Sequence, residues 1–133
     1  MINLVSTAAL LKRKLSSLAS WDRENLLIWL AWHAGRSSLA VVQDGNKITG
    51  AAIARPISNL GQTRIQYHVE EGGSIVFVEK CVALNNQAFL LLLRRMKDRF
   101  PKATHILFSR NKSGHQMKLY PIEKFLKKVK ITT

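Results

Sequence analysis

The spacing of hydrophobic and polar positions changes several times along the chain, and each change predicts a new element. Apolar residues recur at helical intervals over Leu4–Leu18, which predicts an amphipathic helix. A second apolar stretch, Trp21–Ala34, follows two capping candidates, Ser20 and Asp22, and it predicts a helix that ends at Gly35. This second helix is apolar on nearly every side, which is typical of a buried helix or of the wall of a groove for an acyl chain or a partner.

The spacing then becomes that of β-strands. Ser38–Gln43 and Ile48–Ile57 are expected to pair as a hairpin, because the turn-forming residues of Asp44–Lys47 separate them. Ile65–Glu71 is expected to form a third strand, and two glycines lead from it into the next apolar run. The pattern therefore predicts a succession of antiparallel connections.

A strand-helix-strand pattern follows and is the most informative part of the chain. The apolar run Ser74–Leu84 is expected to be a strand with one acid, Glu79, inside it. A helix is expected over Ala88–Phe100, and a second strand over His105–Arg110. Because ligands collect where strand ends meet helix starts, this βαβ unit predicts a binding site beside Glu79.

The last segment, Gly114–Lys130, is expected to be helical at both ends and interrupted at Pro121. Together these elements predict an α/β (α+β) fold with a mixed, mostly antiparallel sheet and helices on both faces. At 133 residues, of which 47% are hydrophobic, the chain is expected to be a single domain over residues 1–133.

The charge of the chain is large and uneven. The net charge is +13, and Arg94–Thr133 holds twelve Lys/Arg against two acids, a net charge of +10. Met1–Leu93 holds nine Lys/Arg against six acids, a net charge of +3. The basic C-terminal part predicts an anionic partner: nucleic acid, an acidic protein or a phosphate-bearing cofactor. The alternative is a surface charged only for solubility.

Three further observations limit the class of protein. The longest apolar run, Ala88–Leu93, is too short to span a bilayer, and the basic residues Lys12–Lys14 follow the N-terminal apolar stretch where a secretory signal needs them in front. A single cysteine, Cys81, favours a reducing, cytoplasmic setting. The four histidines are dispersed, so no metal site is expected.

Two side chains of the Glu79 strand are candidates for chemistry. Glu79 on a central strand is expected to act as a general base or to form a salt bridge with Lys80 or Arg55. Cys81 lies two residues further and shares its strand face, but no histidine is near it in sequence. A buried core cysteine is therefore favoured over a nucleophile.

The order of elements resembles that of the GCN5-related N-acetyltransferase (GNAT) superfamily. Leu39–Ala51, with its Asp-Gly turn, is similar to the family's second and third strands, and Glu79–Leu84 to its fourth. Phe108–Asn111 is similar to the fifth strand, whose end carries an Asn in many members. Tyr120 follows the next helical stretch, where many members place a tyrosine that acts as an acid.

The resemblance implies a function and a set of site residues. It implies transfer of an acyl group from acetyl-CoA, another acyl-CoA or an acyl-carrier protein to an amine on a small molecule or protein. Glu79 and Tyr120 would be the catalytic base and acid. The donor-binding residues that it implies are Val82, Leu84, Asn86, Gln87, Arg94 and Asn111.

One departure from the family pattern leaves alternatives open. The family's phosphate-binding signature contains glycines, whereas Leu84–Ala88 contains none. The toxin-activating lysine acyltransferases, a divergent branch, also lack the signature, and small phage-encoded GNAT-like proteins are a further variant. The competing hypothesis is a non-enzymatic module that keeps this scaffold and uses its basic half to bind nucleic acid or an acidic protein.

Overall fold

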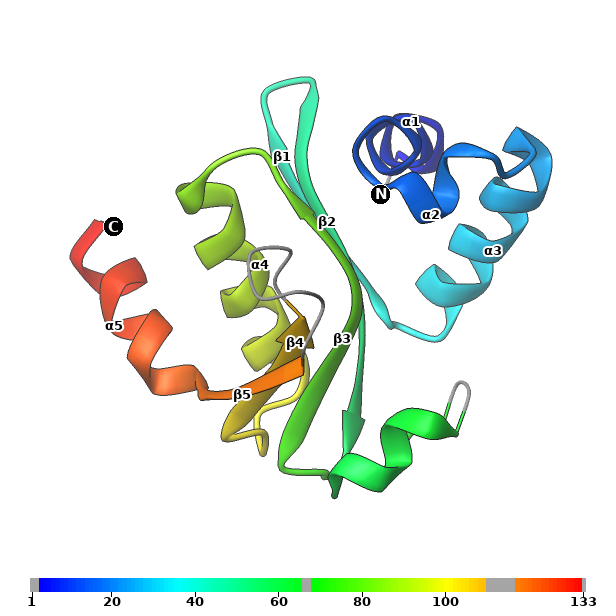
Figure 1. The fold of residues 1–133 in the computed structure, drawn as a ribbon. Helices are drawn as coiled ribbons and strands as arrows, with labels where there is room; N and C mark the ends of the chain where they lie inside the picture. The colour runs from blue at the N-terminus through cyan, green and yellow to red at the C-terminus, as the bar shows by residue number, and fades with distance from the viewer. Residues whose placement is uncertain (1–2, 66–67, 110–116, 133) are drawn as a thin grey trace. The chain divides into compact units, whose positions relative to one another are not determined.

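A computed structural model describes residues 3–65, 68–109 and 117–132 (Figure 1). In chain order the elements are α1 (Leu4–Lys14), α2 (Ser16–Ala19), α3 (Arg23–Gly35), β1 (Leu39–Asp44), β2 (Lys47–Ile57), the 3-10 helix η1 (Leu60–Arg64), β3 (Ile75–Ala83), α4 (Asn86–Arg99), β4 (His105–Ser109), β5 (Met117–Pro121) and α5 (Ile122–Thr132). The strands of the described residues form one sheet in the order β1-β2-β3-β4-β5. Strands β3 and β4 are parallel, whereas β1 with β2 and β4 with β5 are antiparallel. The predicted mixed sheet of an α+β fold is confirmed.

The chain divides into two compact units. The first unit combines Met1–Ile53 with Lys80–Leu92, and the second combines Ala54–Glu79 with Leu93–Thr133. The boundary falls inside β2, β3 and α4, so each of these elements contributes residues to both units. The single domain expected from the sequence stays a prediction.

Helix caps fix the N-terminal helices of the first unit. The Asn3 side chain accepts a hydrogen bond from the Ser6 N–H at 3.0 Å and begins α1. The Asp22 carboxylate accepts from the Asn25 N–H at 3.4 Å and begins α3. Of the two capping candidates, Asp22 is therefore the cap of α3. Each cap satisfies a backbone donor that has no partner within its helix.

The single helix predicted over Leu4–Leu18 is wrong, because Leu15 is extended (φ −113°, ψ 114°) and separates α1 from α2. The break redirects the chain so that Leu18 is fully buried with Leu10 and Leu11 of α1. The ammonium of Lys12 donates to the Trp21 carbonyl at 2.5 Å, and this bond holds the segment between α1 and α3 against α1. Tertiary packing has overridden the continuous helical spacing.

The β1–β2 hairpin and the start of α4 complete the first unit. Gly45 takes a positive φ of 62° in the predicted turn, a backbone conformation that glycine adopts without strain. A Cβ on Gly50 of β2 would lie 3.0 Å from Leu92 Cδ1 of α4, so only glycine allows this close approach without a shift of the leucine. Leu30, Leu39, Ile53 and Val82 belong to the core of this unit.

The predicted βαβ unit is confirmed as β3, α4 and β4. The two strands are parallel, with Phe77 opposite Leu107, and α4 connects them. On the Phe77 face, Ile57, Ile75, Phe77 and Leu107 form the buried core cluster of the second unit. The two continuous apolar runs therefore form the buried strands β3 and β4, as such runs commonly do in α/β units.

The strand predicted over Ile65–Glu71 is wrong. The chain instead forms η1, which ends at Arg64, and the described residues from 65 to 72 are bends, turns and irregular backbone. Backbone carbonyls of this segment accept hydrogen bonds from the side chain of Arg55 instead of from a neighbouring strand. We name residues 58–71 the η1 segment.

The C-terminal prediction is wrong in part. Met117–Pro121 is the strand β5, antiparallel to β4, where a helix was expected. Pro121 is the last residue of β5, and α5 begins directly after it at Ile122, whose N–H donates to the Thr104 carbonyl at 3.0 Å. A proline is tolerated at the end of an edge strand, where no ladder bond is lost. Arg110 lies outside the described residues.

Candidate functional site

Glu79 lies on β3 and forms an ion pair with Arg55 of β2. The Arg55 Nε donates to Glu79 Oε1 at 3.0 Å. The arginine side chain is 6% exposed and the glutamate side chain 21% exposed, so one partner is buried and the other reaches the surface. Of the two salt-bridge partners expected from the sequence, Arg55 is the one that pairs. Lys80 instead donates to the Ser17 hydroxyl at 3.0 Å in the first unit.

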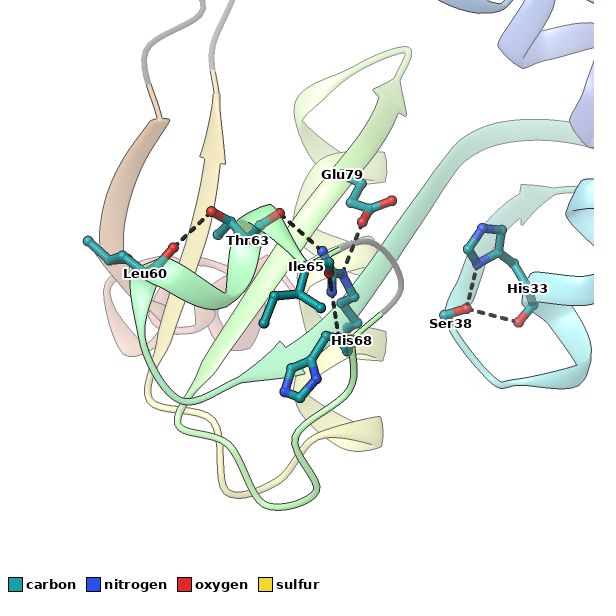
Figure 2. Close-up of polar contacts among 8 residues, drawn as sticks. His33, Ser38, Leu60, Thr63, Ile65, His68 and Glu79 are labelled. Atoms are coloured by element: carbon teal, nitrogen blue, oxygen red, sulfur yellow. Dashed lines mark hydrogen bonds and ion pairs between the residues drawn. The ribbon is translucent and has the colours of Figure 1, made fainter.

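The guanidinium of Arg55 uses its other donors on the η1 segment. Nη1 donates to the carbonyls of Ile65 at 2.8 Å and His68 at 2.6 Å, and Nη2 to the carbonyl of Thr63 at 3.4 Å (Figure 2). Its carbon lies 5.1 Å from the ring centre of Phe77, a cation–π contact. A planar fork with five donors suits this arrangement, and lysine could not reproduce it. We name Arg55, Glu79 and these three carbonyls the Arg55 network.

The Arg55 network does not use every acceptor position of the Glu79 carboxylate. A carboxylate has two oxygens and about four acceptor positions, and the ion pair uses Oε1. The side chain is 21% exposed, so it is partly open to solvent. The salt bridge and the general base therefore do not exclude each other.

A second polar cluster lies in the same unit, and it was not predicted from the sequence. His68 Nε2 lies 3.2 Å from Glu70 Oε2, and Gln62 Nε2 donates to the same oxygen at 3.5 Å. Gln62 Oε1 accepts from the Ser58 N–H at 2.6 Å. These contacts tie the two ends of the η1 segment together. Because the segment was expected to be a strand, no spacing rule pointed to them.

The junction of β3 and α4 holds four of the predicted donor-binding residues. Only Leu84 and Asn85 separate the strand from the helix. Asn85 caps α4, since its Oδ1 accepts from the Ala88 N–H at 2.8 Å. Asn86 and Gln87 are exposed in the first turn, where backbone N–H groups have no partner within the helix. The first turn therefore offers donors and a positive dipole end to an anion.

Two of the predicted donor-binding residues, Val82 and Leu84, have different surroundings. The Leu84 N–H donates to the Thr49 carbonyl at 2.9 Å, so this hydrogen bond would have to be exchanged before Leu84 could hold a ligand oxygen. Val82 is buried in the core of the first unit. The role of both residues stays a prediction.

Arg94 does not lie at the start of α4. It is eight residues after Asn86, about 12 Å along the helix axis at the usual rise. Its Nε lies 3.4 Å from Asp98 Oδ1, one turn further on. The structure thus separates Arg94 from the first-turn amides with which the sequence grouped it. Asn111 lies outside the described residues.

Tyr120 is on β5 and not after a helix, and the structure does not bring it close to Glu79. It is opposite Ile106, which is opposite Val76 of β3, so Tyr120 shares a sheet face with Val76. Glu79 is three residues after Val76 and faces the other side, about 14 Å away between Cα atoms by strand geometry. The centre of the Tyr120 ring lies 5.1 Å from the centre of the Phe108 ring, so the two aromatic side chains pack together.

Two other titratable groups are held uncharged. Burial, and then the positive charge of Arg36, lower the pKa of His33 to about 4. The His33 ring makes edge contacts with Trp29 and Trp32, and its Nδ1 lies 2.8 Å from the Ser38 hydroxyl (Figure 2). Burial raises the pKa of Cys81 to about 11, so its thiol stays protonated and unreactive at neutral pH.

Two absences apply to the described part of the chain. None of its helices combines the length and the apolar character needed to cross a bilayer. Within the same residues, no three His, Cys, Asp or Glu side chains gather in a way that could hold a metal ion.

The arrangement of helices and strands is a GNAT-like fold, as similarity in three dimensions shows. A solved structure described as "GphF GNAT-like decarboxylase in complex with isobutyryl-CoA" superposes with a TM-score of 0.56 over 80% of this chain, at 17% sequence identity. The chain spans 61% of the length of that protein. No protein-family model and no curated protein sequence matches the chain. The similarity shows the GNAT-like fold expected from the order of elements.

Proposed function

We propose that the chain binds an acyl-CoA, or the same thioester on a carrier protein, and transfers its acyl group to an amine. The observation that carries the proposal is the β3–α4 junction, where a strand leads within two residues into an exposed helix start. The GNAT-like structure that superposes on this chain is described as holding isobutyryl-CoA, which supports a thioester donor. Because a fold alone does not determine function, the chain's own residues must be tested.

The donor's phosphates would meet the first turn of α4. The N–H groups of Asn86 and Gln87 and the amides of their side chains are suitable donors for phosphate oxygens. Without glycine at Leu84–Ala88, the backbone cannot enclose the phosphates as closely as in the family's glycine-rich loop. We therefore place the chain in a divergent GNAT-like branch, comparable with the toxin-activating lysine acyltransferases or the small phage proteins.

Glu79 would supply the base for transfer. The amine nitrogen forms a bond to the thioester carbonyl carbon, the carbon–sulfur bond breaks, and the amine proton passes to Glu79. The leaving thiolate takes a proton from water, so the balance does not require Tyr120. The hydrogen bond from Arg55 fixes the position of the carboxylate on β3.

The test is Glu79→Gln, with Glu71→Gln as a matched control, because Glu71 is an exposed acid of the same unit. With acetyl-CoA or isobutyryl-CoA and a panel of peptide and polyamine acceptors, release of free CoA thiol reports turnover. Glu79→Gln should lower turnover by roughly a hundredfold or more and leave donor affinity unchanged, whereas the control should match the wild type. Equal turnover in all three proteins would show that Glu79 is structural.

A further inference from the structure

The second unit carries positive charge that its own carboxylates do not neutralise. It holds +9 of the net charge of +13, because Ala54–Glu79 has two Lys/Arg against three acids and Leu93–Thr133 twelve against two. Its acids are largely engaged within the unit: Glu79 pairs with Arg55, Glu70 with His68, and Asp98 with Arg94. The unit therefore keeps a net positive charge that attracts an external anion.

Much of this positive charge is exposed on α4, on the turn that follows α4, and on α5. On α5, Ile122 and Leu126 are buried while Lys124 and Lys127 are exposed, so the helix turns a basic face to solvent. On α4, Leu93 and Met96 are buried, and the arginines lie on the exposed side. The exposed cations of α4, its following turn and α5 on which the proposal rests are Arg95, Lys102, Lys124 and Lys127. We name these four side chains the basic helix surface.

The apolar side chains that are exposed lie elsewhere. Among the described side chains, the large exposed hydrophobic residues are Val5, Ile28, Trp32, Leu60, Ile65, Val69, Met117 and Leu119, and none is on α4 or α5. A protein–protein interface has an apolar centre, and a helix that binds a membrane surface exposes an apolar face. A surface of arginine and lysine without such a centre suits a polyphosphate backbone, which is recognised by charge and by guanidinium–phosphate hydrogen bonds.

We propose that the basic helix surface binds nucleic acid through its phosphates, without reading base sequence. Contacts of this kind supply affinity and fix position, but they do not discriminate between bases. The proposal goes beyond acyl transfer and does not depend on it, because it uses none of Glu79, Asn86 or Gln87. A protein that fails to bind acyl-CoA could still bind nucleic acid through these helices.

The experiment uses the full chain and a fluorescein-labelled 20-base-pair duplex of mixed sequence, with anisotropy measured from 50 to 300 mM NaCl. Four to five phosphate contacts give a log–log salt slope of about −4. A quadruple variant changes four exposed cations of the surface: Arg95→Gln, Lys102→Gln, Lys124→Gln and Lys127→Gln. A control removes the same charge from exposed positions of the first unit: Arg13→Gln, Lys14→Gln, Arg23→Gln and Lys47→Gln.

The surface variant should lose at least about tenfold in affinity at 100 mM NaCl and reduce the slope by about 3, while the control changes affinity less than about threefold. Absence of binding by the wild type at 50 mM NaCl would overturn the proposal, and so would equal losses in the two variants. Polyglutamate of matched charge is the competitor. If it displaces the duplex as well as unlabelled duplex does, the partner is an acidic protein and the proposal is wrong. The wild-type slope and this competition do not depend on the variants folding.

Discussion

Replacing Arg55 tests whether the Arg55 network holds the η1 segment on the second unit. Arg55→Met keeps the volume and the apolar stem but removes four hydrogen bonds, one of them within the ion pair with Glu79. Three backbone carbonyls and one carboxylate oxygen then lose a charged donor. Breaking a buried ion pair by removing one partner costs about 3–5 kcal/mol, and because Glu79 is 21% exposed we expect the lower end, about 3 kcal/mol.

Two readouts separate a local effect from a global one. Urea unfolding followed by far-UV circular dichroism gives the free energy of unfolding, and hydrogen exchange of peptides from residues 58–71 reports the η1 segment. Arg64→Met is the matched control, because Arg64 is an exposed arginine of that same segment. It should change stability by less than about 0.5 kcal/mol. A cost below about 1 kcal/mol for Arg55→Met, or unchanged exchange in the η1 segment, would show that the Arg55 network does not hold this segment.

Two further predictions concern other parts of the molecule. The pKa of His33 is about 4 in the folded state against 6.5 in the unfolded state, so on acidification the unfolded chain binds the proton first. The free energy of unfolding therefore keeps its full value above pH 6.5 and falls by about 3 kcal/mol between pH 6.5 and pH 4. His33→Gln should remove this pH dependence in unfolding measured across that range. Gly73→Ala should lower the free energy of unfolding by about 3 kcal/mol, because the new Cβ would lie 2.5 Å from the Ile57 carbonyl oxygen. The control is Gly35→Ala, where a Cβ would have nothing within 4 Å, and it should change the free energy of unfolding by less than about 1 kcal/mol in the same urea assay.

Continuous apolar patterns predicted the fold well. Three elements were predicted because each has a single, regular spacing of apolar residues: the strand around Glu79, the helix after it and the strand at His105. In each of them the packed structure is the one that the local sequence favours. The hairpin was predicted for the same reason, since Asp44–Lys47 supplies the turn residues that its geometry needs. These elements establish the βαβ junction, whereas the place of the donor at that junction stays a prediction.

The η1 segment and β5 could not be predicted in the same way. Ile65–Glu71 has strand-like composition, but its carbonyls bind a guanidinium from a residue ten or more positions earlier in the chain. Met117–Pro121 is a strand only because β4 offers an edge, which a local pattern does not reveal.

The geometry of the candidate site depends on distances in space, which the separation of residues along the sequence does not reveal. Arg94 seemed close to Asn86 in sequence, yet the helix rise separates them by about 12 Å. Register places Tyr120 on the sheet face opposite to Glu79, although both lie on strands of the second unit. The partner of Glu79 was one of two residues that the sequence left open, and side-chain geometry decides for Arg55.

Titration calorimetry with acetyl-CoA and isobutyryl-CoA measures whether the helix start after β3 binds an acyl-CoA. We expect one-to-one binding, and dephosphorylated donor analogues should bind more weakly in proportion to the phosphate lost. Replacement of the cap by Asn85→Ala should weaken binding without unfolding the protein, because it loosens the first turn of α4. No heat with either donor at millimolar concentration, together with no displacement of a fluorescent acyl-CoA, would contradict the account.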